Sequence, residues 1–504
     1  MPLLEIAYGF LAAWLALYGL NTLALAVVYV RVRTRRPEVA PLPRSWPVVT
    51  VQLPIYNELH VVERSIAAAA ALDYPRELLQ IQVLDDSTDG TSVVAQQAVA
   101  RYAQMGIDIQ YMHRCDRAGF KAGALAVGLQ RATGELLAIF DADFVPPADF
   151  LRRIVPYFVL PKVGCVQARW THLNRAYSTL TRAQAMGIDG HFIVEQEARS
   201  QAGFFLNFNG SAGVWRRVCI QEAGGWQADT LTEDLDLSYR AQLAGWRILY
   251  VPDVTAAAEL PPQLDALRRQ QARWARGSIQ VARKLLPLLL RSDQPWPIKL
   301  EGAIHLTGYM VHPLILITLL LTLPMVLTHS RVSALLPYFF LATAGPPLLY
   351  LVAQAERGPG WWHELRFAPL LLLLGVGLAL NNTVAMAPAF WGRKGEFQRT
   401  PKFDIKGSMD HWQDSAYALR CTGLVWCELL LAIFALVLAF LASRGEARSI
   451  SYWLVVYALS YAYIATMSLI QARQAQHKES ILAWMHRNRS QAQARSSVKS
   501  QHLS

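Results

Sequence analysis

The sequence LLAIFDADF, at residues 136–144, places a short apolar run directly before two acids, Asp141 and Asp143. A second stretch of similar design, IQVLDDSTD at residues 81–89, also ends its apolar run in two acids. Continuous short apolar runs are typical of strands buried on both faces, as in parallel sheets. Both stretches therefore predict strands of one parallel sheet, with the acids at the edge where α/β folds bind ligands.

Strand-like and helix-like patterns alternate around these two stretches. Short apolar runs indicate strands, whereas longer segments with apolar residues three to four positions apart indicate helices. The expected strands are residues 48–53, 79–84 and 136–140, and the expected helices are residues 60–72, 91–104 and 121–131. This order predicts an α/β fold with a Rossmann-like first half.

The composition indicates a membrane protein. Of the 504 residues, 53% are hydrophobic and only 17% are charged. Five apolar runs approach the length of about 20 residues that crosses a bilayer. They are residues 6–30, 303–328, 334–354, 422–443 and 451–471. A sixth run, residues 367–380, stops at Asn381 and Asn382, which favours an interfacial or re-entrant helix.

The net charge of +11 comes partly from basic residues beside these apolar runs. The first run is followed by Arg31, Arg33, Arg35 and Arg36. The basic tail contains Arg473, Lys478, Arg487, Arg489, Arg495 and Lys499. This placement favours membrane lipids as partners and argues against nucleic acid. The positive-inside rule puts the arginines after the first run, residues 393–406 and the tail on one cytoplasmic side, with Arg331, Arg444 and Arg448 opposite.

The ends and cysteines of the chain agree with an integral membrane protein. The amino terminus MPLLE lacks a basic n-region, so the first run is expected to be an anchor and not a cleaved signal peptide. The five cysteines form no CxxC pair and are expected to be reduced. The expected parts are a transmembrane helix (1–33), a cytoplasmic domain (34–290), transmembrane and interfacial helices (291–475) and a basic cytoplasmic tail (476–504).

Acids at strand ends suit a diphosphate that carries a divalent cation. Mg²⁺ prefers hard oxygen ligands and commonly takes one or two carboxylates together with phosphate oxygens and water. Asp141 and Asp143 could supply these carboxylates, although an Asp-rich stretch before Pro146 also fits a solvated turn. His172 and His191 have no partner ligands nearby in the sequence and are expected to be structural.

Two further motifs follow in the same domain. The segment TLTEDLD, at residues 230–236, offers two adjacent acids, but Thr230 and Glu233 also fit a capping box at a helix start. The segment RRQQARWARGS, at residues 268–278, contains the order Q-x-x-R-W and also fits a basic amphipathic helix on a membrane surface. These two interpretations of the second segment are compatible.

The ordered set D, DxD, ED and Q-x-x-R-W, followed by apolar segments, resembles the processive family-2 glycosyltransferases. The sequences of the motifs are most similar to those of the cellulose-synthase-like mannan and glucomannan synthases, through VQLPIYNE, QVLDDSTDGT, FKAGAL, AIFDADF, VQARW, NFNGSAGVWR, EAGGW and QQARW. The resemblance is strong over residues 50–285 and loose beyond them. It implies a GT-A domain, inserted between transmembrane helices, that makes a β-linked polysaccharide by inverting transfer.

The resemblance also implies roles for individual residues. The nucleotide-sugar donor would be held by Asp85, Asp86, Lys121, Asp141, Gln270, Arg273 and Lys402. The metal, Mg²⁺ or Mn²⁺, would be held by Asp141 and Asp143, and the acceptor by Asn209, Gly210, Ser211 and Trp274. Asp234 would be the general base. The implied donor is GDP-mannose, GDP-glucose or UDP-glucose, the acceptor is a growing polysaccharide, and the location is the bacterial inner membrane or an equivalent one.

The segment at residues 395–406 contains FQRTPKF, which resembles the F-x-V-T-x-K gating loop of cellulose synthases through Phe397, Thr400 and Lys402. Arg399 stands where the family has Val. A basic linker beside the membrane is the alternative. A further departure is Phe144, which follows the DxD where many cellulose synthases have histidine, and no cyclic-di-GMP-binding domain is expected.

Two other functions remain open from the sequence. A non-processive lipid glycosyltransferase, similar to ceramide glucosyltransferase, would share the carboxylates and a Q-x-x-R-W-type motif. A transporter or scaffold that kept the fold without catalysis would be expected to lack a base or a metal ligand, and all of these acids are present.

Overall fold

The computed structural model describes residues 2–34, 42–328, 336–393, 395, 397–405, 407, 410–415, 417–419, 421–445 and 447–501, and describes the side chains of these residues except at 2, 336, 337 and 477–501. Several basic positions discussed above lie outside the described residues or side chains. They are Arg35, Arg36, Arg331, Lys406, Lys478, Arg487, Arg489, Arg495 and Lys499.

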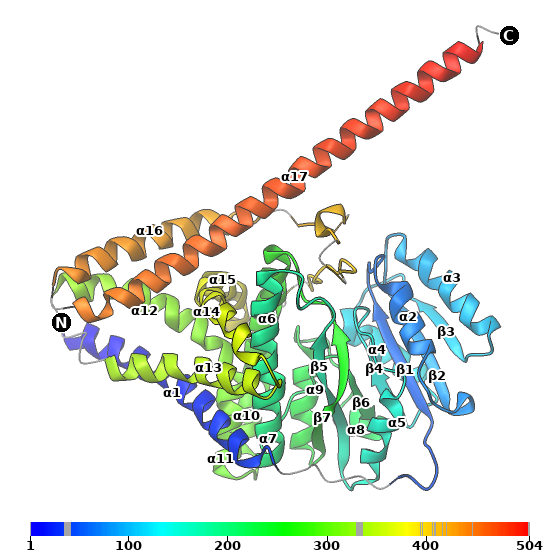
Figure 1. Cartoon of the computed structure of the whole chain (residues 1–504). Coiled ribbons are helices and arrows are strands. Elements are labelled where there is room, and N and C mark those ends of the chain that lie inside the picture. The colour runs from blue at the N-terminus through cyan, green and yellow to red at the C-terminus, as the bar shows by residue number, and fades with distance from the viewer. Residues whose placement is uncertain are drawn as a thin grey trace.

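A seven-stranded sheet, with the strand order β3-β2-β1-β4-β6-β5-β7, forms the centre of the polar domain (Figure 1). The strands are β1 (Val49–Ile55), β2 (Leu79–Asp85), β3 (Ile109–His113), β4 (Leu136–Ile139), β5 (Val163–His172), β6 (Gly213–Arg216) and β7 (Arg247–Ala258). The first four strands are parallel, as predicted for β1, β2 and β4, whereas β3 was not predicted. The sheet as a whole is mixed, because β6 runs antiparallel to both of its neighbours.

The predicted helices of the first half are confirmed as α2 (Val62–Ala70), α3 (Thr91–Gln104) and α4 (Phe120–Arg131). The other helices of this domain are α5 (Phe150–Ile154), α6 (Thr179–Asp189), a π-helical turn η3 (Gly190–Gln196), α7 (Glu197–Ala202), α8 (Arg217–Glu222), α9 (Glu233–Leu243), α10 (Leu264–Arg291) and α11 (Trp296–Leu306). Nearly all residues of β1, β2 and β4 are buried, because both faces of the sheet are covered by helices.

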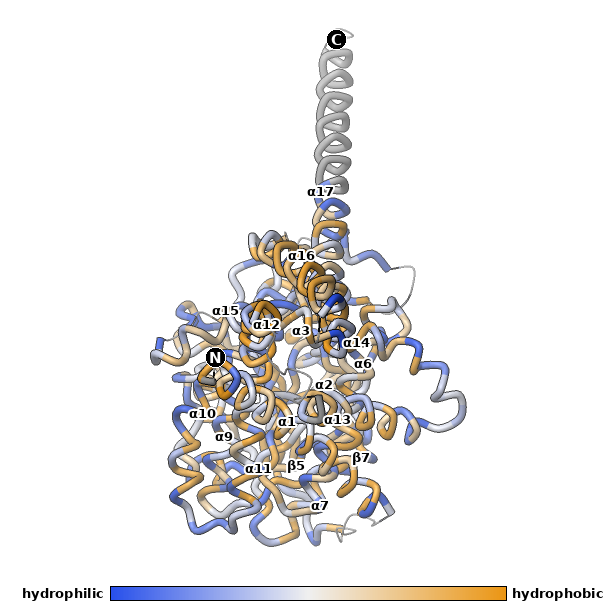
Figure 2. The backbone as a smooth tube through the Cα atoms, turned by 90° about the vertical axis from the view of Figure 1, so that its left-hand side faces the viewer, coloured by the Kyte–Doolittle hydropathy of each residue, from blue (hydrophilic) through white to orange (hydrophobic). Residues whose placement is uncertain are grey.

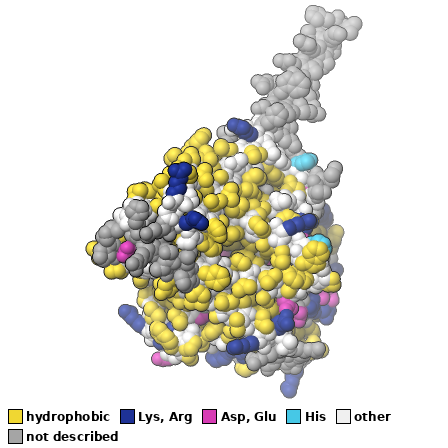
Figure 3. All heavy atoms as spheres, turned by 60° about the vertical axis from the view of Figure 1, so that its left-hand side comes forward, with side chains coloured by type: hydrophobic (Ala, Val, Ile, Leu, Met, Phe, Trp, Pro, Cys, Tyr) yellow, Lys and Arg dark blue, Asp and Glu magenta, His cyan; other side chains and the backbone are white. Residues whose placement is uncertain are grey.

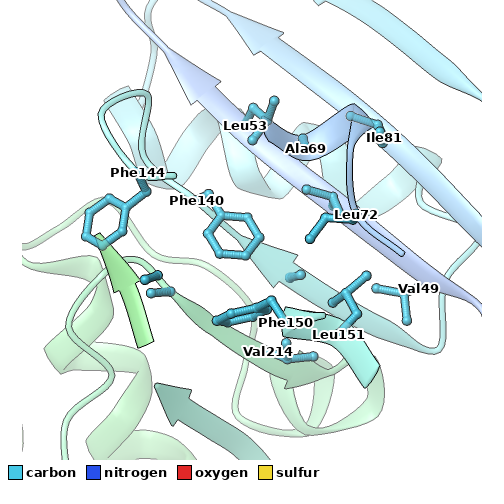
Figure 4. Packing of buried hydrophobic residues seen from close by; sticks show 14 of the residues in the cluster. Val49, Leu53, Ala69, Leu72, Ile81, Phe140, Phe144, Phe150, Leu151 and Val214 are labelled. Atoms are coloured by element: carbon cyan, nitrogen blue, oxygen red, sulfur yellow. The ribbon is translucent and has the colours of Figure 1, made fainter. Parts of the chain in front are cut away.

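Buried side chains between the sheet and its helices fix the strand ends that carry the acids. Phe140, directly before Asp141, packs edge-on against Phe150 with ring centroids 5.0 Å apart. Figure 4 shows both rings among Leu72, Val49 and other apolar side chains. Full burial of one such side chain contributes about 1.5–3 kcal/mol. The packing therefore anchors the start of the DxD segment.

Apolar helices cluster on one side of the domain and are rich in hydrophobic residues (Figures 1 and 2). They are α1 (Pro2–Val32), α12 (Val311–Leu327), α13 (Leu336–Ala355), α14 (Ala368–Gly377), α15 (Ala379–Phe390), α16 (Leu424–Ser443) and α17 (Ser451–Gln501). Large apolar side chains face outwards, including Leu430 and Ile433 of α16 at 67% and 60% exposure. Figure 3 shows a broad hydrophobic face, which is the surface that a bilayer would cover.

Among the described residues, six helical segments are long and apolar enough to cross a membrane, one more than predicted. The additional segment is Trp361–Phe390, which contains residues 367–380. The expected run at 303–328 is confirmed as the candidate span Gly308–Leu327, although its first residues belong to a separate helix, because α11 ends at Leu306 and α12 begins at Val311. A run of apolar composition does not reveal where a helix breaks.

The segment Trp361–Phe390 differs from a straight span in two ways. It breaks at Leu378, between α14 and α15. Glu364 near its start pairs with Arg182 of α6 at 2.9 Å, and the loop beyond its end reaches the polar domain again. Because both ends contact the same domain, the geometry favours a re-entrant or interfacial segment.

Candidate active site

Two predicted donor residues, Lys121 and Asp141, meet the predicted acceptor residues Gly210 and Ser211 beyond the end of β4. Asp85 is the last residue of β2, and Asp141 follows β4 closely. The Nζ of Lys121 lies 2.6 Å from Asp141 Oδ1 and donates to the Gly210 carbonyl at 2.7 Å. The backbone N–H of Asp141 donates to Ser211 Oγ at 2.9 Å. The loop that carries Gly210 and Ser211 is therefore held directly against the DxD segment.

Asp143 is buried beneath the loop that was predicted to gate the site. Its Oδ2 lies 2.6 Å from Lys402 Nζ and accepts a 3.3 Å hydrogen bond from the Glu259 backbone N–H. Its Oδ1 is buried with no hydrogen-bond partner among the described residues. An unpartnered buried carboxylate oxygen is costly, and a cation would satisfy it. The two aspartates therefore fit a divalent metal that takes its other ligands from phosphate and water.

The other acid pair is engaged by its own surroundings. Asp85 accepts from Ser92 Oγ at 2.7 Å and from Tyr111 OH at 2.6 Å. Asp86 accepts two hydrogen bonds from the Arg114 guanidinium, at 2.7 and 2.5 Å. These contacts hold the loop after β2 in place at the edge of the site.

Asp234 lies at the start of α9 and faces Lys121. The predicted capping box of Thr230 and Glu233 is absent, because α9 begins without a side-chain cap. A Cβ added at Gly210 would lie 2.8 Å from Asp234 Oδ2, so only glycine fits at this approach. Burial and the Glu233 carboxylate raise the pKa of Asp234 to about 7, although Lys121 opposes the shift. A carboxyl group with this pKa is suited to proton transfer near neutral pH.

The Q-x-x-R-W segment lies on α10, and its three motif residues face two different parts of the molecule. Gln270 and Trp274 line the same cavity as Asp234. Arg273 instead faces the gating segment, with its guanidinium 4.8 Å from the centre of the Phe397 ring. The helix therefore links the cavity to the loop, and the predicted amphipathic character is compatible with that role.

This cavity has a volume of about 700 Å³ and reaches from the polar domain into the apolar helices. Its polar part includes Asn209, Asp234, Gln270 and Trp274. Its other part is lined by residues of the apolar helices, including Tyr8, Thr322, Phe339, Trp453 and Tyr457. Aromatic rings offer sugar faces an apolar contact without a fixed hydrogen-bond register.

The gating segment is packed against the site through two glutamates that the sequence did not single out. Glu259 accepts from the backbone N–H groups of Phe403 and Asp404, at 2.8 and 3.0 Å. Glu58 pairs with Arg399 at 3.3 Å. The Arg399 side chain is thus engaged by Glu58.

Both glutamates are perturbed by their surroundings. Burial raises the pKa of Glu58 to about 8, against the Arg399 charge, and raises that of Glu259 to about 7, against its hydrogen bond from Phe403. Each lies just beyond a strand, since Glu58 follows β1 and Glu259 follows β7. The only sequence feature that could have indicated these two glutamates is their position just after a strand. Their partners in the gating segment lie more than 140 residues away in the sequence.

The fold and the site together define a GT-A glycosyltransferase domain. Residues 47–277 match the family described as Glycosyltransferase like family 2. This part of the chain is therefore similar to family-2 glycosyltransferases, as the sequence resemblance predicted, and the predicted fold class is confirmed.

Curated relatives extend the likeness to named enzymes. The chain is 46% identical over 255 residues to Glucomannan 4-beta-mannosyltransferase 2 of Arabidopsis thaliana, covering 50% of this chain and 48% of that protein. It is 40% identical over 313 residues to Glucomannan 4-beta-mannosyltransferase 1 of Oryza sativa subsp. japonica, covering 58% of this chain and 60% of that protein. The matches thus span about half the length of these relatives.

A solved structure shows the same fold. It is that of mannosyltransferase PcManGT from Pyrobaculum calidifontis in complex with GDP-Man and Mn²⁺, with a TM-score of 0.52 and 24% identity. The likeness covers 77% of this chain and 100% of that chain. At this identity it bears on the fold alone.

Proposed function

We propose that the protein is a membrane-embedded, inverting glycosyltransferase that makes a β-linked polysaccharide, a mannan or glucomannan, from a nucleotide sugar. The observation that supports this function best is that Asp234, Trp274 and the apolar helices line one cavity. A base and an aromatic platform at one part of a long cavity suit an acceptor that is extended there and then moves on between the helices. The similarity to glucomannan mannosyltransferases supports this choice of product.

Asp234 acts in this mechanism as the base that removes the proton from the acceptor hydroxyl. Its raised pKa makes it a stronger base than an exposed aspartate while leaving much of it ionised at neutral pH. Lys121, between Asp141 and Gly210, places positive charge where the donor diphosphate would lie. Burial opposes the charge of Lys121, but Asp141 and Glu233 outweigh it and raise its pKa. It stays protonated.

Asp141 and Asp143 would hold Mg²⁺ or Mn²⁺ in this proposal. A divalent cation bound there would neutralise the charge that develops on the leaving diphosphate. Lys402 already pairs with Asp143, so the gating segment contributes a positive charge at the same place. The packed segment would also exclude water from the donor, which limits its hydrolysis.

Donor choice and product length test the function. The purified chain is offered GDP-mannose, GDP-glucose, UDP-glucose and UDP-N-acetylglucosamine separately with Mn²⁺, and any product is analysed for linkage and length. We expect a long β-linked polymer from a GDP-sugar. A single sugar on a lipid would favour the lipid glycosyltransferase, and no transfer from any donor would contradict an enzymatic function.

Orientation is part of the proposal, because the apolar helices alone do not fix the side. We propose that the glycosyltransferase domain is cytoplasmic. Cysteine labels near residues 395 and 490 should then react only from inside, and labels at the amino terminus and near residue 330 only from outside. Labelling at 395 from outside would contradict both this orientation and the re-entrant segment.

A further inference from the structure

A chain of hydrogen-bonded polar side chains lies along the cavity wall and centres on His191. This residue lies in the π-helical turn η3 and lines the cavity. Its Nδ1 is 3.0 Å from Glu195 Oε2, and its Nε2 is 3.0 Å from Asn209 Nδ2. Asn209 Oδ1 in turn accepts from Gln196 Nε2 at 2.6 Å. π-helical turns interrupt a helix at a cost and often lie at functional sites.

The far end of this chain is fixed by buried ions. Glu195 lies 3.5 Å from Arg199, and Arg199 is bound to Glu301 of α11 at 2.7 Å, with both of these residues 4% exposed. Burial opposes the Glu195 charge, but His191 and Arg199 outweigh it and hold its pKa below the ordinary value. Glu195 is therefore an ionised hydrogen-bond acceptor.

The acceptor character of Glu195 determines the remaining proton positions. Because a carboxylate cannot donate, His191 must carry its proton on Nδ1, which leaves Nε2 as an acceptor when the ring is neutral. Only the Nδ2 of Asn209 can donate to that nitrogen. The Asn209 amide is thus held in one orientation from both sides, since Gln196 Nε2 must face an oxygen.

One N–H of the Asn209 amide is left over by these contacts, and the side chain lies on the cavity wall. The next residue, Gly210, approaches Asp234 so closely that an added Cβ would be 2.8 Å from its Oδ2. The spare donor and the base therefore belong to the same small region.

We infer that His191 is a positioning residue for the acceptor, because it orients the Asn209 amide so that its free N–H binds a hydroxyl of the terminal sugar. The inference rests on the proposed function and deepens it. It also replaces the structural role expected for His191 from the sequence. The site takes a carbohydrate chain end, in which a hydroxyl oxygen accepts from Asn209 while another hydroxyl is deprotonated by Asp234.

A purely structural histidine would stabilise η3 without affecting one substrate more than the other. The test therefore measures KM for acceptor and donor separately, using the donor that the wild-type chain accepts and a short oligosaccharide of the linkage found in its product. His191→Ala should raise the acceptor KM roughly tenfold, the effect of losing about one hydrogen bond, with the donor KM unchanged. His191→Gln keeps an acceptor atom near the position of Nε2 and should restore most of the loss.

Asn209→Asp provides a second, nearly isosteric variant in case His191→Ala does not fold. It keeps the oxygen that faces Gln196 and removes the free N–H, so the acceptor KM should rise although thermal stability is retained. His363→Ala, which changes an exposed histidine of the segment before α14, is the matched control and should leave both KM values unchanged.

Unchanged acceptor KM in a folded His191→Ala or Asn209→Asp variant would overturn the inference, as would a folded His191→Gln that behaves like His191→Ala. These outcomes are separable from failure of the proposed function. If the proposed function itself were wrong, the wild-type chain would transfer no sugar, whichever donor was supplied.

Discussion

Two acid pairs of similar local sequence lie at the ends of β2 and β4, two parallel strands that are separated by β1, yet the surroundings of the two pairs differ. At the end of β2, Asp85 and Asp86 are occupied by partners from the adjoining loop and β3, among them Tyr111 and Arg114. At the end of β4, the charges of Asp141 and Asp143 are met by the lysines Lys121 of α4 and Lys402 of the gating segment, and Asp143 Oδ1 has no hydrogen-bond partner among the described residues.

The difference shows that an acidic motif acquires its role from what the fold brings to it. Carboxylates saturated by nearby donors mainly hold the backbone, because a new ligand would have to displace existing hydrogen bonds. Carboxylates countered by lysine side chains can exchange those partners for a cation and a diphosphate. Asp234 belongs with the second group, since its carboxylate accepts from the Leu235 backbone N–H of its own helix and lines the cavity.

The largest effect is expected at Asp234. Asp234→Asn keeps the size of the side chain and removes its basicity, so transfer should fall by about 10²–10⁴-fold. Calorimetry should show donor affinity close to that of the wild type. Asp229→Asn, the same change at an exposed neighbour, is the control and should retain activity. Near-normal turnover of the Asp234→Asn variant would show that Asp234 is not the catalytic base.

The pH profile sharpens the same assignment. Because the pKa of Asp234 is raised to about 7, the base is increasingly protonated below that pH and the rate should fall there. Glu259 also has a pKa of about 7, so its contribution must be separated. If Asp234 is responsible, the acid limb, which is the fall of the transfer rate at low pH, should occur at the same pH in Glu259→Gln as in the wild type. A limb that disappears in Glu259→Gln would instead point to the gating segment.

A smaller effect is expected at Asp143. Asp143→Asn removes the charge that we propose to bind the cation, so donor affinity in Mn²⁺ should fall by about 10–100-fold, as for one charge-assisted contact. Without Mn²⁺ the wild type and variant should bind the donor similarly. Asp149→Asn, an exposed acid outside the site, provides the control. Equal affinity of Asp143→Asn and the wild type in Mn²⁺ would make the DxD segment a turn, as the alternative interpretation has it.

Lys402 should matter somewhat less, because Lys121 supplies charge to the same region. Lys402→Ala should lower donor affinity and turnover together, by about tenfold, the order of one lost charged contact. Arg399→Gln should affect only turnover, because Arg399 is engaged by Glu58. A Lys402→Ala enzyme with normal kinetics would favour a plain basic linker at residues 395–406.

The sequence was sufficient to predict the strands and helices that depend on local apolar patterns. The strands ending at Asp85 and near Asp141, and the helix at residues 91–104, follow from apolar patterns of a few residues. The family resemblance came from the ordered motifs. Antiparallel β6 was missed, because strand direction depends on pairing partners that a local pattern does not contain.

Long-range contacts explain what could not be predicted at the site. Glu58 and Glu259 gain their roles only when the gating segment packs against them. His191 has no ligand-like neighbour in the sequence, and its place beside Asn209 results from the π-helical turn. The break at Leu378 escaped a hydropathy argument, which measures composition and not helix continuity.

The smallest effect on transfer is expected for Tyr111→Phe, which removes only the hydroxyl that donates to Asp85. Burial opposes the Asp85 charge, but hydrogen bonds from Ser87, Tyr111 and Ser92 outweigh it and hold its pKa below the ordinary value. A depressed carboxyl pKa contributes stability above the unfolded-state pKa and loses it as the pH falls through the folded-state pKa.

Tyr111→Phe should therefore lower the free energy of unfolding by about 1 kcal/mol at neutral pH. The difference from the wild type should shrink in acid, and thermal melts across a pH series measure it. The transfer rate should not change, because Asp85 keeps its remaining donors and the loop after β2 stays in place. A large loss of transfer with unchanged melting would contradict the contrast between the two acid pairs, because Asp85 would then be acting on the donor and not on the backbone.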